Sequence, residues 1–151
     1  MARPIPDGHN AVSPYLIVDG GARALEFYKK AFGATEMFRL QAPDGNIVHA
    51  EIRIGDTVIM LADVHTEVDA HDPKHYKGSP VSLHVYTEDV DKMAASAVAA
   101  GATVKRPVQD MFYGDRSGTF VDPFGHIWHV ATHKEDLTAE EIGRRAAQQK
   151  H

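Results

Sequence analysis

The sequence contains no cysteine, and this absence removes several classes of protein from consideration. Disulfide scaffolds, thiolate zinc sites and cysteine nucleophiles are all excluded. No Gly-rich phosphate loop precedes a predicted helix, so a nucleotide cofactor is not expected. No serine, histidine and acidic residue stand in a sequence context that supports nucleophilic catalysis.

Basic charge and long apolar runs are also scarce. The chain has 16 Lys and Arg against 21 Asp and Glu, a net charge of −5 that argues against a nucleic-acid partner. No segment approaches the roughly 20 apolar residues that span a bilayer. The N-terminal stretch MARPIPDGHNA has no apolar run that could serve as a signal peptide. We therefore expect a cytoplasmic protein that has neither a membrane nor a nucleic-acid partner.

The chain does contain an internal repeat. Three pairs of segments match in the same order, each pair separated by about 69 residues. One match could arise by chance, but three in order with one spacing indicate a duplication. The pairs are VSPYLIVDG (12–20) with VSLHVYTED (81–89), LEFYKKAFGAT (25–35) with MAASAVAAGAT (93–103), and GDTVIMLAD (55–63) with FGHIWHVAT (124–132).

Each copy predicts a strand, a helix ended by glycine, and further strands joined by tight turns. The expected fold class is α+β, with two tandem βαβββ modules forming a cleft within one domain. The tail has a capping box from Thr138 to Glu141 that predicts a short helix. The expected boundaries are 10–63 for the first module, 64–80 for a polar linker, 81–133 for the second module and 134–151 for the helical tail.

Strand alternation divides the side chains between two faces of each sheet. In segment 46–54 one face is apolar and should pack under a helix, with Val48, Ala50, Ile52 and Ile54. The other face is too polar for a closed core, with Ile47, His49, Glu51 and Arg53. The two-residue turn at Gly55-Asp56 pairs Glu51 with Met60. Trp128, the only tryptophan, alternates with His129 and should face the helices.

If the two mixed polar and aromatic faces meet across the cleft, their side chains converge on one pocket. Polar groups that converge in a partly apolar cleft favour a ligand-binding site. No residue is assigned a catalytic role, and the pocket could close within one chain or across two. The expected pocket residues are Tyr15, His49, Glu51, Met60, His84, Tyr86 and His129.

The two βαβββ copies, the LEFYKKAFGA helix and the DPFGHIW strand resemble the vicinal oxygen chelate superfamily. This superfamily includes glyoxalase I, extradiol dioxygenases, fosfomycin-resistance enzymes and bleomycin-resistance proteins. The segments HAEIRIGDTVIMLAD (49–63) and FYGDRSGTFVDPFGHIWHVATH (112–133) resemble more narrowly its PhnB-like branch. The resemblance implies a homodimer with a small-molecule ligand or substrate.

The metal enzymes of this superfamily place one ligand on the first and last strand of each copy. The matching positions here are Ser13, Met60, Ser82 and His129, of which only His129 is a normal metal ligand. The standard metal site is therefore not expected, and no cofactor is assigned. A shifted divalent-metal site made of Glu51, His84 and His129 is the alternative.

Two functions remain open at this point. The first is a binding protein that holds a small aromatic or cationic molecule without metal, as the likeness to bleomycin-resistance proteins implies. The second is a metal-dependent lyase, isomerase or dioxygenase that uses the shifted site.

Overall fold

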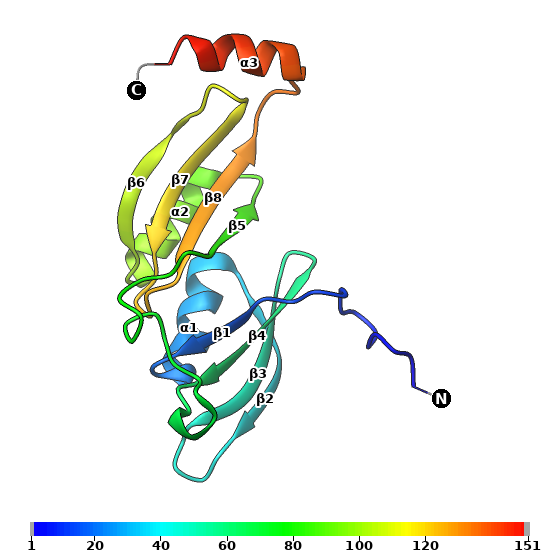
Figure 1. Ribbon diagram of the computed structural model, residues 1–151, viewed down its shortest axis with the longest axis vertical. Coiled ribbons are helices and arrows are strands. Elements are labelled where there is room, and N and C mark those ends of the chain that lie inside the picture. Colours follow the sequence, from blue (N-terminus) through cyan, green and yellow to red (C-terminus); the bar gives the residue numbers. More distant parts are fainter. Residues whose placement is uncertain (1, 150–151) are drawn as a thin grey trace.

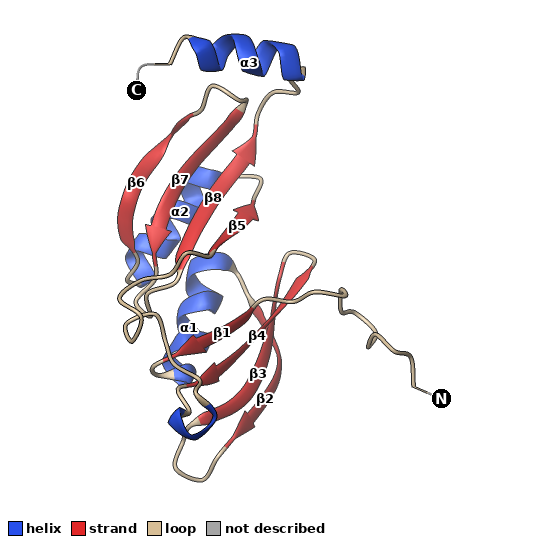
Figure 2. Ribbon diagram, viewed as in Figure 1, coloured by secondary structure: helices blue, strands red, loops and turns tan. Residues whose placement is uncertain are grey.

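A computed structural model describes residues 2–149 of the chain. It has two four-stranded sheets and three α-helices, so the predicted α+β class of two βαβββ modules is confirmed (Figures 1 and 2). The strand orders are β1-β4-β3-β2 and β5-β8-β7-β6, so the same topology occurs twice. The first module comprises β1 (Tyr15–Val18), α1 (Gly21–Phe32), β2 (Thr35–Gln41), β3 (Ile47–Ile54) and β4 (Thr57–Asp63). The second comprises β5 (Ser82–Tyr86), α2 (Val90–Ala100), β6 (Thr103–Asp110), β7 (Asp115–Val121) and β8 (Ile127–His133).

The last strand of each module anchors the start of that module's helix. Asp63 at the end of β4 accepts hydrogen bonds from the Gly20 and Gly21 amides at 2.9 and 2.8 Å. Thr132 near the end of β8 accepts one from the Val90 amide at 2.9 Å. Helix N-termini leave amide groups without partners inside the helix, and these side chains satisfy some of them. The duplication is therefore preserved in contacts as well as in sequence.

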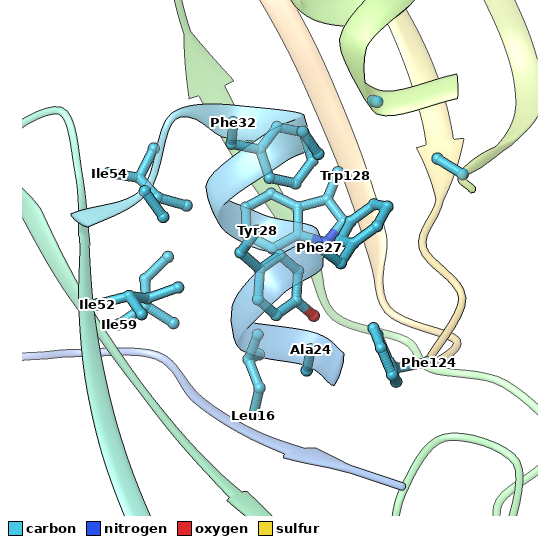
Figure 3. Close-up of a cluster of buried hydrophobic side chains, with 14 of the residues drawn as sticks. Leu16, Ala24, Phe27, Tyr28, Phe32, Ile52, Ile54, Ile59, Phe124 and Trp128 are labelled. Carbon is cyan, nitrogen blue, oxygen red and sulfur yellow. The ribbon is translucent and has the colours of Figure 1, made fainter. Parts of the chain in front are cut away.

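The core joins the two modules through the packing of α1 against β8 (Figure 3). The ring centroids of Phe32 and Trp128 lie 4.4 Å apart, and those of Tyr28 and Trp128 lie 5.4 Å apart. Trp128 is 0% exposed, so its predicted position facing the helices is confirmed. Because the helix sides of both sheets pack into this shared core, their mixed faces point away from it.

One predicted face is wrong at the start of β3. Ile47 is 1% exposed and belongs to the core, whereas Val48 is 53% exposed. The cause is a β-bulge: Leu40 pairs with His49 but Gln41 pairs with Ile47, so Val48 is an extra residue. From His49 onward the alternation is as predicted, and Glu51 pairs with Met60.

The segments outside the two modules are short. A 3₁₀ turn, η1 (Thr66–Val68), lies in the linker, and helix α3 (Ala139–Ala147) follows β8. The predicted helix cap of α3 is present, because the Thr138 Oγ1 accepts from the Glu141 amide at 3.1 Å. Within residues 2–149, no helix is both long enough and apolar enough to cross a membrane.

Candidate functional site

The mixed face of the first sheet carries a chain of hydrogen-bonded side chains. His49 Nε2 lies 2.9 Å from Glu51 Oε2, and His49 Nδ1 lies 2.8 Å from the Tyr15 hydroxyl. The second Glu51 oxygen, Oε1, lies 2.7 Å from Nε2 of His9. Tyr15 and Glu51 flank Met60 in the register of β1, β4 and β3, which places all three on one face.

The electrostatics of this chain keep Glu51 ionised. The hydrogen bond from His49 lowers the pKa of Glu51, the bond from His9 lowers it further, and burial opposes both. The hydrogen bond to Glu51 raises the pKa of His9, and burial raises that of Tyr15. When Nε2 of His49 donates to Glu51, its Nδ1 can accept a hydrogen bond from the Tyr15 hydroxyl. The network is therefore pre-ordered to donate and accept hydrogen bonds at an open face.

The mixed face of the second sheet is built around His129. Its Nδ1 lies 2.9 Å from Thr119 Oγ1, and its Nε2 lies 3.0 Å from Ser82 Oγ. His84 pairs with His129 in the register, with ring centroids 6.0 Å apart, and its ring lies 4.7 Å from that of Tyr86. Burial lowers the pKa of His129, which favours a neutral imidazole.

The structure places the seven predicted pocket residues in two groups on separate sheets. Tyr15, His84 and Tyr86 line a cavity of about 760 Å³ between the edge strands β1 and β5. The other four do not line it. A single chain therefore does not bring all seven into one pocket, and their convergence stays a prediction for a pocket made by two chains. The residues outside the cavity are His49, Glu51 and Met60 on the first sheet and His129 on the second.

The residues at the superfamily's metal positions do not fit a divalent ion. Met60 and the two serines are poor ligands for such a cation, and both ring nitrogens of His129 already face hydroxyl groups. Within residues 2–149, no three His, Asp or Glu side chains are placed to hold a metal. The shifted set is also divided, because Glu51 lies on the first sheet between two imidazoles.

Sequence reasoning missed His9, which completes the network around Glu51. His9 lies in an irregular segment, where neither the helical nor the strand period gives a side chain a direction. The segment nevertheless lies close to the sheet. A Cβ added at Gly8 would lie 3.0 Å from the guanidinium of Arg53 on β3. The only sequence feature identified in this stretch was the lack of an apolar run.

Two βαβββ modules with mixed polar faces define the class of protein. The model of the Glyoxalase/Bleomycin resistance protein/Dioxygenase superfamily matches residues 9–130. The chain belongs to this superfamily, as the resemblance implied.

Individual relatives support this assignment. The uncharacterised Mycobacterium bovis protein Mb0911c is 39% identical over 135 residues, covering 87% of this chain and 89% of its own. The crystal structure of the Arabidopsis thaliana At5g48480 product is 26% identical, with a TM-score of 0.66 over 81% of this chain and 98% of its own. A PhnB protein from Bacillus cereus shares the fold, with 17% identity and a TM-score of 0.61 over 82% of this chain and 99% of its own.

Proposed function

We propose that the protein binds a small molecule in a cleft formed between two copies of the chain, without the superfamily's standard metal site. The observation that carries this proposal is the outward direction of both mixed faces. Tyr15 and Phe38 on the first sheet are each 49% exposed, and Tyr86 on the second is 64% exposed. Large aromatic side chains on open, polar-lined faces favour a binding surface.

A second copy would cover these faces. Strands β1 and β5 each lie at an edge of their sheet, with one side unpaired among residues 2–149. Exposed edges of this kind are templates for pairing with another chain. In a twofold dimer, β1 of each copy can approach β5 of the other, which gives two equivalent clefts. Each cleft then combines the first sheet of one copy with the second sheet of its partner.

The exposed groups favour a ligand with a flat apolar part and hydrogen-bonding groups. Tyr15 and Phe38 can pack against an aromatic ring, and the Tyr15–His49–Glu51 network can hydrogen-bond to its substituents. Glu51 is already paired with two imidazoles, so its charge gives less support to a cationic ligand than to an aromatic one. Cytoplasmic location stays a prediction from the sequence.

The test begins with the metal content of untagged protein by mass spectrometry. Metal-free protein is then screened with aromatic small molecules by thermal shift, and hits are measured by calorimetry. We expect saturable binding without metal, weakened by Tyr15→Ala and His49→Ala. Tyr76→Ala is the control, because Tyr76 is also exposed, at 62% against 49% for Tyr15, but lies in the linker. Near-stoichiometric metal that is lost in both His129→Ala and His84→Ala would overturn the proposal and favour the metal-dependent enzyme.

A further inference from the structure

A second pocket, of about 600 Å³, lies on the open face of the second sheet beside His129. Its lining contains two cationic side chains and no carboxylate, although the whole chain has a net charge of −5. Lys105 and Arg106 supply the positive charge. Ser79, Ser82 and Thr119 add three hydroxyl groups to the lining, and the ring nitrogens of His129 bond to those of Thr119 and Ser82.

The two cations reach the same face because of a β-bulge in β6. Val104 pairs with Phe120 and Arg106 pairs with Thr119, so Lys105 is an extra residue in the ladder. Strict alternation would turn Lys105 and Arg106 to opposite sides, whereas a bulge redirects a side chain. Both therefore line the pocket beside His129.

Neither cation is neutralised by an acidic neighbour. Within residues 2–149, no salt bridge involves Lys105 or Arg106, and Arg106 instead donates to the carbonyl and Oγ of Ser117 at 2.9 and 2.7 Å. These bonds hold the guanidinium in place without removing its charge. By contrast, Arg116 on the neighbouring strand is paired with Asp91 and Asp110. An arginine and a lysine that form no salt bridge within the described residues, beside hydroxyl groups that His129 holds in place, are suited to an oxyanion.

The equivalent bulge in the first module has a different character. There the extra residue is Met37, next to Phe38, and the two are 50% and 49% exposed. Phe38 pairs with Glu51 and so lies on the open face of the first sheet. The duplication thus offers an apolar surface on one sheet and a cationic surface on the other.

We propose that Lys105 and Arg106, with Ser82 and Thr119, form a subsite for the oxyanion of a small molecule whose other end is aromatic or apolar. The anion subsite lies within one chain. Its part in holding a ligand that also contacts Tyr15 and Phe38 rests on the proposed function, in which the second sheet faces the first sheet of the partner.

In the first arm of the test, the protein is titrated with inorganic phosphate or sulfate while the backbone amide signals are recorded by NMR. We expect saturable shifts at residues 82, 105, 106 and 119 that weaken as salt is added. Lys105→Glu should weaken phosphate binding by about tenfold, and Arg106→Lys, which keeps the charge, by about threefold. Lys74→Glu makes the same change of charge at an exposed linker lysine and should leave binding unchanged. Phosphate shifts that are absent, or that persist unchanged in Lys105→Glu, would overturn the subsite.

The second arm compares phenylphosphonate and benzoate with uncharged benzyl alcohol and cationic benzylamine. We expect the two anions to bind more tightly than the other probes in the natural protein, and to lose this advantage in Lys105→Glu. If benzylamine and benzyl alcohol bind at Tyr15 with no preference for the anions, the subsite is wrong while the proposed function stands. If phosphate binds at Lys105 but no aromatic probe binds, the subsite stands and the proposed function fails.

Discussion

Tyr28 in the first module donates its hydroxyl proton to the carboxylate of Asp122 in the second, across 2.6 Å and 94 positions of sequence. The same oxygen of Asp122 accepts from the Trp128 indole at 2.9 Å. Its other oxygen accepts from the amides of Phe124 and His126 at 2.8 and 3.0 Å. One buried carboxylate thus fixes the turn before β8, the tryptophan of the core and the first helix. This junction holds the helix sides of the modules together and leaves their mixed faces open.

Asp122→Ala should destabilise the protein by about 3–5 kcal/mol, because it leaves buried donors without an acceptor. Chemical unfolding followed by tryptophan fluorescence measures the loss. Asp56→Ala is the control, since Asp56 is an exposed turn aspartate whose side chain, among residues 2–149, bonds to Thr57 alone. It should change the free energy of unfolding by about 0.5 kcal/mol or less. Equal effects of the two changes would contradict the role given to Asp122.

Alternation predicted most of what lies on each side of the sheets. It placed Trp128 in the core and paired Glu51 with Met60, because these positions follow a regular period of two. It failed where a strand contains an extra residue. Val48 and Lys105 are such residues, and nothing in the hydropathy of their segments marks a bulge. The bulge at Val48 made the prediction wrong for one core residue, and no face was predicted for the segment that contains Lys105.

The alternation of side chains along a strand also cannot predict which other part of the protein packs against each face of a sheet. The sequence identified the polar and aromatic residues of both faces, but their convergence depended on how the modules pack. That packing is decided by contacts distant in sequence, such as Tyr28 with Asp122 and Phe32 with Trp128. His9 was invisible for a related reason, since its position depends on a contact with Glu51, 42 residues away.

The bulge at Val48 restricts which residue can stand at the start of helix α1. Ile47 is turned onto the start of α1, where a Cβ added at Gly21 would lie 2.6 Å from the Ile47 side chain. Gly21→Ala should therefore destabilise the protein by about 1–3 kcal/mol through overpacking. Ile47→Ala removes the nearest of the Ile47 atoms, Cγ1, so Gly21→Ala should cost less in the Ile47→Ala background than in the natural protein, which a double-mutant cycle measures.

Gly143→Ala is the matched control, because Gly143 is also helical and an added Cβ there meets nothing within 4 Å. That change should be neutral or slightly stabilising. If Gly21→Ala were equally harmless, the close approach of Ile47 would not constrain the helix.

The proposed dimer should depend on apolar residues beside the edge strands. Val81 directly precedes β5, is 67% exposed and lines the cavity between β1 and β5. Val81→Asp should shift the protein towards monomer, because an unpaired carboxylate would be buried against the second copy. Light scattering coupled to size-exclusion chromatography reports the mass in solution.

Val68→Asp provides the comparison for that experiment. Val68 has the same 67% exposure but lies in the linker turn η1, outside the cavity. The Val68→Asp variant should have the same mass in solution as the natural protein. If the natural protein is monomeric at all concentrations tested, the proposed shared cleft is wrong, whatever the result for Val81→Asp.

The contact between His9 and Glu51 should hold the N-terminal segment most firmly in mildly acidic solution. The pKa of His9 is raised from 6.5, so its contribution is complete below that pH and is lost as the pH rises through the higher, folded-state value. The pKa of Glu51 is lowered from 4.5, so its contribution is present above that pH and is lost on further acidification. Both groups are charged and paired between about pH 4.5 and 6.5.

Heteronuclear NOE values for the amides of residues 7–10 should therefore be higher at pH 5.8 than at pH 8. Glu51→Gln should abolish the difference, because the amide cannot supply the charge that favours His9 in its protonated form. His133 serves as an internal reference, since its pKa is also raised, by hydrogen bonds to Asp115 and Asp136, and Glu51 takes no part in them. If residues 7–10 kept the same order at both pH values in the natural protein, the ion pair would not be what holds the segment over the first sheet.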